Sequence, residues 1–571
     1  MTIAFGSDHG GFKLKEHLKT ALAGSGEAVD CGCFGVESCD YPDYAAEVSE
    51  KVLSGAARFG VLVCTTGEGM AMAANRFHSV RAALCRDVAT AVASRTHNNA
   101  NILVLGAAAT SPAEAEEIAR AFFAAQPDPA PRHARRVAKI DRAMRLAEFS
   151  ALASADPEVH AAILAQVRQE DTEINLIASE NTSSRAVREA AGSVLMNKYA
   201  EGYPAHRWYS GCGPVDAAEE LARTRACALF GADHANVQPH CGSSANMAVF
   251  FACLQPGDKI LSLSLDQGGH LSHGSPVNFS GKLYNIVPYT TSRETERIDY
   301  DELERLALAE KPRLLLSGAS AYPRALDFKR IREIVDKTTA AMKAEDPASP
   351  GCVMMVDMAH IAGLVAGGAH ESPVPYADFT TTTTHKTLRG PRGGLVLCKK
   401  EWAKKLDSAV FPGMQGGPLE NIIAAKAVCF KEAASPEFRE YAAQIVKNCK
   451  AMCAVIASRG YRIVSGGTDN HLFLVDVKSS KGITGKDAAA ALDAAGIVVN
   501  KNTIPYDTES PFRTSGIRVG TASVTTRGMK EAECETIGGW IADILDDISD
   551  TAVQQRVKAK AAALVAGFPV P

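Results

Sequence analysis

The stretch Asp378-Phe-Thr-Thr-Thr-Thr-Thr-His-Lys386 decides the fold of the larger part of this chain. A phenylalanine followed by β-branched threonines predicts a strand, and His385 and Lys386 come where that strand ends. Upstream, Val353-Met-Met-Val-Asp357 predicts a second, buried strand that ends in a carboxylate. The sequence therefore places a lysine and an aspartate at the ends of two strands of an expected α/β sheet.

A lysine and an aspartate in these positions are what a pyridoxal 5'-phosphate (PLP) site needs. The lysine can hold the cofactor aldehyde as a Schiff base, and the aspartate can keep the pyridine nitrogen protonated, so that the ring accepts electrons. Cys241-Gly-Ser-Ser244 predicts a turn that opens a helix, where backbone N–H groups favour a phosphate. His270, which follows two glycines, could stack on the ring.

Composition and charge are those of an ordinary globular protein. Apolar residues make up 46% and charged residues 22% of 571 residues, too many for one core, so about two to four domains are expected. The net charge of −4 gives no electrostatic reason for a nucleic-acid or membrane partner, and no stretch reaches the ~20 apolar residues of a membrane span. We expect small-molecule substrates only.

Two further features bear on the compartment. The N-terminus has no basic region or long apolar run and so does not resemble a signal peptide. The 15 cysteines are scattered, without a CxxC pair, which favours a reducing compartment. We expect a cytoplasmic protein.

Short apolar runs alternate with helical patterns along residues 1–125, which predicts parallel βαβ units in a doubly wound, Rossmann-like sheet. A proline-rich run at 126–131 breaks the pattern, and a basic helix is expected from Arg132 to about Glu148. A larger α/β pattern follows, and from about residue 430 its texture changes to that of a small α+β domain. The predicted domains are 1–150, 151–430 and 431–571.

Long motifs in residues 152–571 carry a resemblance to a known family. They are Leu176-Ile-Ala-Ser-Glu-Asn181, Asn197-Lys-Tyr-Ala-Glu-Gly-Tyr-Pro204, His273-Gly-Ser-Pro-Val-Asn-Phe-Ser-Gly281, Phe411-Pro-Gly-Met-Gln-Gly-Gly-Pro418 and Thr514-Ser-Gly-Ile-Arg-Val-Gly520. This part of the chain closely resembles serine hydroxymethyltransferase, a fold-type I PLP enzyme. The resemblance implies that serine and tetrahydrofolate, the co-substrate, give glycine and methylenetetrahydrofolate.

The resemblance also implies roles for single residues. Lys386 would be the Schiff-base lysine, Glu201 would handle the proton of the serine hydroxyl, and Arg518 would grip the substrate carboxylate with a bidentate fork. The other expected PLP contacts are Asp357 at the pyridine nitrogen, His360, His270, Thr383, Gly242 and Ser243, with Gly416 and Gly417 from a partner subunit. Catalytic His385, with Ser179, Tyr209 and Arg392, would lie near the amino acid. The expected folate-side positions are Leu265, Gly269, Leu271, Asn502, Ser510, Pro511 and Phe512. Cys241 stands where the family usually has serine.

Polar residues also cluster around the predicted strands of the first 125 residues. Asp8-His9 and Cys64-Thr-Thr-Gly-Glu-Gly69 each follow a strand, His97-Asn98 precedes another, and Arg132 and Arg136 have helical i, i+4 spacing. Because strand carboxyl ends share one edge of a doubly wound sheet, we expect these groups to converge. Glycine-turn N–H groups and paired arginines suit an oxyanion and a phosphate.

Together with Gly6-Ser-Asp-His-Gly10, Asp40-Tyr-Pro-Asp-Tyr-Ala45 and Ser94-Arg-Thr-His-Asn98, these motifs resemble the type B ribose-5-phosphate isomerase family over about residues 1–145. The resemblance implies that Cys64 moves a proton between C2 and C1 and that His97 opens the furanose ring. Thr66, with the backbone of Thr65, Gly67 and Gly69, would stabilise the enediolate. Asp8, Tyr41 and Asn98 would bind hydroxyls, and His9, Arg132 and Arg136 would hold the phosphate.

Alternatives remain open for both halves. The first domain could be a non-catalytic oligomerisation module or could isomerise another sugar phosphate, and the second half could be a folate-independent aldolase of threonine-like substrates. Both resembled families form dimers or larger assemblies, so we expect a homodimer or homotetramer. No metal ion is expected at either site.

Overall fold

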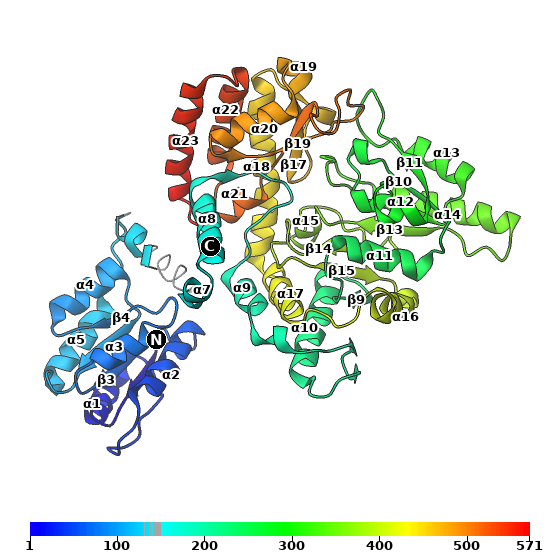
Figure 1. The fold of residues 1–571 in the computed structure, drawn as a ribbon. Helices are drawn as coiled ribbons and strands as arrows, with labels where there is room; N and C mark the ends of the chain where they lie inside the picture. The colour runs from blue at the N-terminus through cyan, green and yellow to red at the C-terminus, as the bar shows by residue number, and fades with distance from the viewer. Residues whose placement is uncertain (131, 138, 141–149, 571) are drawn as a thin grey trace. The chain divides into compact units, whose positions relative to one another are not determined.

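Figure 1 shows the computed structural model of the chain, which describes residues 1–130, 132–137, 139–140 and 150–570. The chain divides into two compact units, Met1–Gln166 and Val167–Pro571. The expected basic helix is helical at 132–137 and 139–140, and the rest of its predicted length, at 138 and 141–148, lies outside the described residues.

The first unit is built on a parallel sheet, as predicted. Its strands are β1 (Thr2–Ser7), β2 (Glu27–Asp30), β3 (Phe59–Cys64), β4 (Ala82–Leu84) and β5 (Ile102–Gly106). Their order is β2-β1-β3-β5-β4, and every ladder is parallel. β1 lies between the strands that follow it, so the chain winds both ways from it and the sheet is doubly wound.

Helices cover both faces of this sheet because its strands are apolar on both sides. They are α1 (Phe12–Ala21), α2 (Tyr41–Leu53), α3 (Glu68–Ala74), α4 (Val88–Asn98) and α5 (Pro112–Ala124). Val61 and Val63 pack in one core with residues of α1, α4 and α5, while Leu62 packs in the other with residues of α2 and α3. Successive side chains point to opposite faces of a strand, so one apolar run supplies both cores.

Two elements of the first unit escaped prediction. β2 is short and only partly buried, and α2 follows a cysteine- and glycine-rich segment that hides its beginning. α2 starts at Tyr41 with a proline in its first turn, a signal for a helix N-terminus that the sequence does carry.

A mixed sheet forms the framework of the second unit. Its strands are β9 (His234–Asn236), β10 (Lys259–Leu263), β11 (Asn285–Tyr289), β12 (Leu314–Ser317), β13 (Val353–Asp357), β14 (Phe379–Thr383) and β15 (Gly394–Cys398). The order is β11-β10-β12-β13-β14-β15-β9, with β15 antiparallel to both of its neighbours. The predicted strands that end in Asp357 and precede Lys386 are thus adjacent and parallel.

Helices pack on both faces of this sheet as well. The larger core takes residues of α9 (Arg185–Ala191), α10 (Gly213–Phe230), α13 (Tyr300–Glu310), α14 (Phe328–Glu345), α15 (Ala362–Ala366), α17 (Glu420–Ala433) and α18 (Pro436–Ser458). The opposite core takes residues of α11 (Gly242–Cys253) and α16 (Ala403–Ser408).

A smaller antiparallel sheet lies towards the C-terminus. Its strands are β16 (Arg462–Ile463), β17 (Leu472–Asp476), β19 (Asn500–Asn502) and β20 (Gly516–Gly520), in the order β16-β17-β20-β19. It packs with α20 (Gly485–Ala494), α22 (Glu531–Asp546) and α23 (Thr551–Ala566). The second half of α18 joins this core, as does the early strand β6 (Ile174–Asn175), which pairs with β18 (Ile497–Val498). The predicted small α+β domain therefore also recruits residues from before the large sheet.

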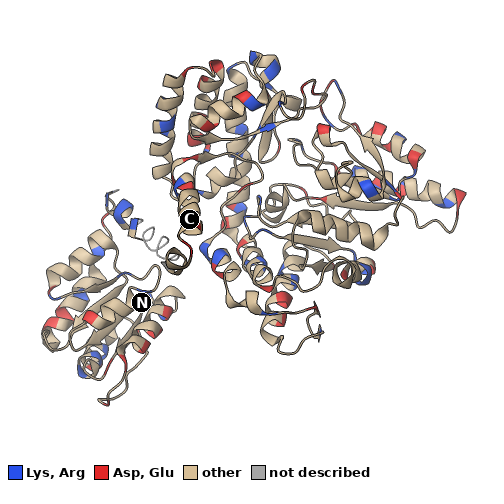
Figure 2. Cartoon of the chain, viewed as in Figure 1, with Lys and Arg blue, Asp and Glu red and all other residues tan. Residues whose placement is uncertain are grey.

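Surface charge is mixed. In the cartoon of Figure 2, acidic and basic residues are interspersed along the helices of each unit. Every helix within the described residues is too short or too polar to traverse a lipid bilayer.

Candidate active sites

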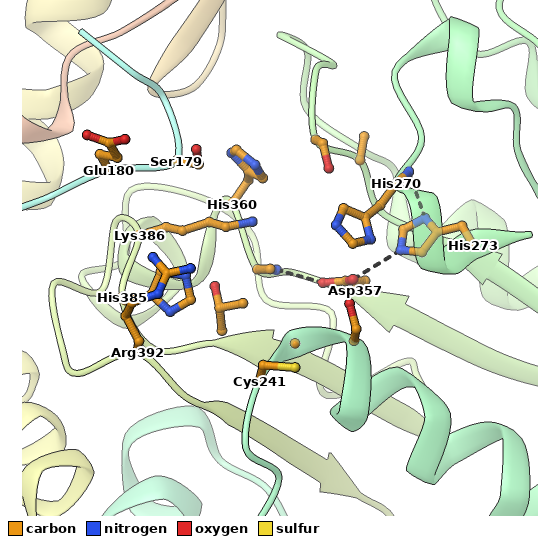
Figure 3. Close-up of a pocket in the computed structure, with 16 residues that line it drawn as sticks. Ser179, Glu180, Cys241, His270, His273, Asp357, His360, His385, Lys386 and Arg392 are labelled. Atoms are coloured by element: carbon orange, nitrogen blue, oxygen red, sulfur yellow. Dashed lines mark hydrogen bonds and ion pairs between the residues drawn. The ribbon is translucent and has the colours of Figure 1, made fainter. Parts of the chain in front are cut away.

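A cavity of about 500 Å³ lies where β13 and β14 end. Its lining residues are Ser179, Glu180, Cys241, Gly242, Ser243, His270, His273, Ala319, Ser320, Asp357, Ala359, His360, Thr383, His385, Lys386 and Arg392. Figure 3 shows the Lys386 side chain pointing into the space between His360 and Asp357, with His270 on the far side. The carboxyl ends of parallel strands are where α/β folds usually bind ligands.

The threonines of β14, and Thr384 directly after it, anchor the groups around this cavity. Thr381 Oγ1 donates a hydrogen bond of 2.6 Å to Asn246 Oδ1, and Asn246 Nδ2 donates to Asp357 Oδ2 at 2.9 Å. Thr384 Oγ1 donates to the Pro391 carbonyl at 2.6 Å and so closes the turn that carries Arg392. Valine would favour a strand equally well but has no hydroxyl, so the threonine run combines strand formation with placement of the site.

Asp357 is held as an anion. Asn246 and the backbone N–H of Ala359 donate to it, and His273 Nε2 lies 3.0 Å from its Oδ2. Burial opposes ionisation, but these hydrogen bonds, that of His273 above all, hold the pKa of Asp357 well below its ordinary value. The ligand atoms of His270, His273 and Asp357 also lie within 4.8 Å of one another, a spacing that can accommodate a metal ion.

Burial shifts the ionisation of the basic groups of the cavity towards their neutral forms. Burial lowers the pKa of Lys386 to about 8; Asp357 opposes this effect, and the charges of Arg518 and Arg392 add to it. Burial likewise lowers the pKa of His270 to about 4 and that of His385 to about 3. A neutral lysine is a nucleophile, and a neutral imidazole can stack on an aromatic ring without bringing a second cation into the site.

The N-terminus of α11 forms a small cradle beside Thr383. A Cβ atom on Gly242 would lie 2.7 Å from Thr383 Cγ2, and Thr383 Oγ1 is buried without a hydrogen-bond partner among the described residues. The loop that leads to α11 is fixed by the buried Lys426, whose Nζ donates to the carbonyls of Val237, Pro239 and Gly394 at 2.6, 3.1 and 2.7 Å. Backbone N–H groups at such a helix start favour an anion.

Two side chains from the small sheet reach this region. Arg518 on β20 donates from Nε to Asn500 Oδ1 at 3.0 Å and from Nη1 to the Ser320 carbonyl at 2.7 Å. His471 Nε2 lies 3.1 Å from His360 Nδ1, and both imidazoles are buried. Burial lowers the pKa of His471 to about 3 and that of His360 well below its ordinary value.

A second group of predicted site residues lies together elsewhere. A Cβ atom on Gly416 would come 3.2 Å from Glu201 Oε1, and one on Gly417 would come 3.2 Å from the Tyr199 ring. Tyr199 and Tyr209 have ring centroids 5.0 Å apart, and burial, then the Glu201 charge, raises the pKa of Tyr209. None of these residues lines the described cavity around Lys386. Within one copy of the chain, the expected proton carrier and the expected Schiff-base lysine are therefore separate.

The predicted folate-side residues lie on exposed segments of the second unit. Leu265 and Leu271 lie on two short 3₁₀ turns, η3 (Leu265–Gln267) and η4 (Leu271–His273), and are about half exposed. Asn502 ends β19, and Ser510, Pro511 and Phe512 lie in the following loop, where Phe512 is 81% exposed. Gly269 packs tightly on the Leu263 carbonyl.

In the first unit, one polar cluster lies at the carboxyl edge of the sheet. The Gly67 N–H donates to Cys64 Sγ at 3.1 Å, and Asp8 Oδ1 accepts from the Gly11 N–H at 2.8 Å. A Cβ atom on Gly10 would lie 2.3 Å from Thr65 Oγ1, and one on Gly69 would lie 2.7 Å from the Tyr41 ring. The segments after β1 and β3 and the start of α2 therefore meet around Cys64.

His97 and Arg132 do not join that cluster, so the prediction that all these groups converge is wrong for one copy of the chain. His97 and Asn98 end α4 and precede β5, which places them at the amino edge of the sheet. His97 stacks on His133 at 4.5 Å, and Arg132 Nε donates to His133 Nε2 at 3.1 Å. The two edges are roughly 16 Å apart, the length of a strand like β5. Only residues that follow a strand share its carboxyl edge.

Comparison with known protein families assigns residues 152–541, more than half of the chain, to serine hydroxymethyltransferase. The chain belongs to the serine hydroxymethyltransferase family. Residues 3–140 match the ribose/galactose isomerase family. The chain is therefore a fusion, in the predicted order, of an isomerase-family domain and a PLP-dependent glycine hydroxymethyltransferase.

Within the hydroxymethyltransferase part, the structure gathers many of the predicted residues in one place. Those that line the cavity are Ser179, Gly242, Ser243, His270, Asp357, His360, Thr383, His385, Lys386 and Arg392. Arg518 reaches the cavity wall at Ser320.

Sequence reasoning missed four side chains that organise the hydroxymethyltransferase cavity. They are Asn246, His273, Lys426 and His471. Asn246 interrupts the apolar stretch Ala245–Phe250 of α11, and a single amide in such a stretch indicates a buried hydrogen-bonding role. His273 follows the Gly268-Gly-His270 motif by three residues, whereas no local sequence feature marks Lys426 or His471.

Proposed function

We propose that the hydroxymethyltransferase part moves the hydroxymethyl carbon of serine to tetrahydrofolate with bound PLP. The observation that carries this proposal is the buried Lys386, with its pKa lowered to about 8, in one cavity with an anionic Asp357.

The residues present fit PLP. The cradle at Gly242, the unpartnered buried hydroxyl of Thr383 and the helix start at α11 suit its phosphate. Asp357 suits a protonated ring nitrogen, and neutral His270 suits a ring face. When bound, PLP supplies an electron sink for charge that develops on the amino acid's Cα.

The chain's own groups have defined tasks in this proposal. Lys386 offers a neutral amine to the cofactor aldehyde, and Asp357 holds a proton at the ring nitrogen. Arg518 binds the substrate carboxylate through its free edge, since Nη2 has no hydrogen bond among the described residues. Glu201 takes the proton from serine Oγ as the hydroxymethyl carbon leaves.

A direct test separates this activity from that of a folate-independent aldolase. The full chain should show a visible PLP band that Lys386→Ala abolishes, and serine cleavage should require added tetrahydrofolate. Cleavage at the same rate without tetrahydrofolate would favour the aldolase.

We also propose that the hydroxymethyltransferase site is completed by a second copy of the chain, in a homodimer or a homotetramer built from such dimers. Glu201, Gly416 and Gly417 lie apart from the cavity of their own chain, next to exposed aromatic residues: Tyr199 is 55% and Trp208 is 78% exposed. Exposed aromatic clusters of this kind mark interfaces.

Mixing two inactive variants tests the shared site. In a heterodimer of Lys386→Ala with Glu201→Gln, one of the two sites receives both intact residues. Random pairing should restore about a quarter of the wild-type activity. No recovery after denaturation and joint refolding would place both groups in one chain.

For the first unit, we propose interconversion of ribose 5-phosphate and ribulose 5-phosphate. Cys64 moves the proton between C2 and C1 while the surrounding N–H groups stabilise the enediolate oxygens. The separation of Cys64 from His97 and Arg132 supports a second copy that supplies ring opening and phosphate binding. The observation that carries this proposal is the cluster of Asp8, Tyr41 and the Thr65 loop around Cys64.

Isomerisation by wild type and by Cys64→Ala decides between activity and a bare oligomerisation module. We expect a loss of at least about 100-fold in Cys64→Ala, and two equally inactive proteins would favour the module. A faster reaction with a six-carbon sugar phosphate would reassign the substrate.

We further propose a cytoplasmic, reducing location. All 15 cysteines lie within the described residues and are unpaired, which supports a compartment that keeps thiols reduced.

A further inference from the structure

A pair of cysteines that neither proposed reaction uses lies beside the isomerase site. Cys33 and Cys39 bracket the segment Phe34-Gly-Val-Glu-Ser38 between β2 and α2. Phe34 and Val36 in that segment are 75% and 62% exposed, so the segment between the two cysteines stands out from the core.

Cys33 is fixed. Its N–H donates to the Ser7 carbonyl at 2.8 Å, which continues the β1 ladder, and its Sγ lies 3.1 Å from the Gly35 carbonyl. The side chain is 4% exposed.

Cys39 is partly exposed and touches both Cys33 and the sugar site. Its thiol lies near enough to the Cys33 thiol and the Tyr44 hydroxyl for both groups to shift its pKa. Its backbone N–H donates to His9 Nδ1 at 3.3 Å, and Tyr41 follows two residues later. Both His9 and Tyr41 are expected sugar-phosphate contacts.

We infer that Cys33 and Cys39 form a reversible disulfide that switches off the isomerase and leaves the hydroxymethyltransferase running. The expected loss of activity rests on the isomerase activity proposed above, whereas the formation of the disulfide does not. Transient disulfides of this kind are the ones that reducing compartments permit.

The reaction with a small disulfide such as oxidised glutathione balances without any further reagent. The Cys39 thiolate attacks one sulfur of the oxidant, forms a mixed disulfide and releases one glutathione thiolate, which takes up the proton lost by Cys39. The Cys33 thiolate then attacks Cys39 Sγ and expels the second glutathione thiolate, which takes up the proton lost by Cys33. Two protein thiols are oxidised, and one glutathione disulfide is reduced to two thiols.

Closure must move Cys39. A disulfide brings the sulfurs to about 2.05 Å, closer than two unbonded thiols can approach, and Cys33 is buried and tied to β1. Cys39 therefore approaches Cys33, drawing its N–H from His9 and the start of α2 from its place. A misplacement of about 1 Å near a reacting substrate can cost roughly 100-fold in rate, so we expect isomerase kcat/KM to fall by about 10- to 100-fold.

The ionisation of Cys39 sets the rate of closure. Burial and the adjacent Cys33 thiol raise the pKa of Cys39, although the Tyr44 hydroxyl opposes this. Because the thiolate is the nucleophile, disulfide formation should accelerate as the pH rises from neutral. Cys31 in the same segment is a suitable control, since burial raises the pKa of its thiol to about 11 and it makes no contact with Cys33 or Cys39 among the described thiol interactions.

The test treats the full chain with oxidised glutathione and maps the disulfide without reduction. Cleavage after Glu37 separates Cys33 from Cys39 in sequence, so a Cys33–Cys39 disulfide keeps the two fragments together until dithiothreitol is added. The same linkage should form in Cys31→Ser, which excludes pairing through Cys31. Absence of the linked fragments from both proteins would overturn the inference.

Activities are measured on the same samples. Oxidised wild type should lose isomerase activity by about 10- to 100-fold, regain it with dithiothreitol and keep full hydroxymethyl transfer. Cys33→Ser and Cys39→Ser should isomerise like reduced wild type and resist the oxidant. Equal inactivation of Cys39→Ser would assign the effect to Cys64, and a linked but fully active isomerase would refute the switch. If reduced wild type does not isomerise, the proposed function fails, whereas the mapping still decides whether the disulfide forms.

Discussion

The pKa of Lys386 predicts how PLP-free protein takes up its cofactor as the pH changes. Only the neutral amine can attack the cofactor aldehyde. Burial lowers the pKa of Lys386 from 10.5 to about 8, a difference of about 2.5. At pH 7 the buried lysine is therefore neutral roughly 300 times more often than an exposed one.

That difference produces a plateau in the rate of uptake. The neutral fraction rises about 50-fold between pH 6 and 8 but less than about twofold between pH 8 and 9, whereas an ordinary lysine would gain about tenfold in that last interval. The assay follows the visible absorbance after PLP is mixed with PLP-free full chain. The pH dependence of PLP itself comes from a free lysine analogue, whose rates are first divided by the neutral fraction of its own amine at each pH. The rates of the full chain are divided by that dependence, and Lys386→Ala gives the background.

Two variants should move the plateau in opposite directions. Asp357 raises the pKa of Lys386, so Asp357→Asn should shift the plateau to lower pH; Arg392 lowers that pKa, so Arg392→Gln should shift it to higher pH. A corrected rate that keeps rising tenfold per pH unit beyond about pH 9 would refute the argument that burial sets the pKa.

Further predictions concern stability and substrate binding in the second unit, where the only tryptophans of the sequence, Trp208, Trp402 and Trp540, report unfolding by fluorescence. Burial and then the Glu219 charge raise the pKa of Glu420 to about 8, so the contribution of Glu420 to stability is present below about pH 4.5 and is lost as the pH rises through 8. Glu420→Gln should therefore lose less stability than wild type between about pH 5.5 and 8.5. An equal change in the urea midpoint of both proteins over that interval would contradict this. Lys426→Met removes the donor of three buried carbonyls and should destabilise the unit by about 1–3 kcal/mol for each carbonyl left unsatisfied; an unchanged urea midpoint would show that water replaces the ammonium. Arg518→Lys loses the planar fork and should raise the KM for serine about 10- to 100-fold at an unchanged PLP absorbance, and an unchanged KM would exclude a carboxylate contact.

Sequence could predict features that are local in the chain. The strand before Lys386 and the strand that ends in Asp357 are apolar or β-branched runs, and both occur as predicted. The identity of the carboxylate and the amine follows from their position at strand ends. The arrangement that ionises Asp357 does not, because Asn246 and His273 come from elements more than 80 residues away.

The failure at His97 has a different cause. Its motif lies close in sequence to strand β5, but closeness to a strand in sequence does not place a residue at the carboxyl edge of the sheet. Whether a residue precedes or follows a strand decides which edge it occupies, and an 11-residue helix is long enough to cross the sheet. Likewise, the contact of Cys33 with Cys39 depends on how an irregular segment folds back, which no periodic pattern encodes.

The turn between β14 and β15 has a consequence for how this protein can vary in length. Thr384 and Gly393 pair across it, the Arg389 N–H donates to the Lys386 carbonyl at 2.9 Å, and Gly390 packs against Cys429. This one short connection thus fixes the positions of both the Lys386 amine and the Arg392 guanidinium, so an added or deleted residue would displace the two groups together. The segment from Lys343 to Ser349, which covers the end of α14 and the start of the loop to β13, is mostly exposed and positions no residue of the site. In a library of single-residue insertions, active variants should therefore be rare at 385–392 and common at 344–349. The geometry of the site thus fixes the length of the turn that carries Lys386.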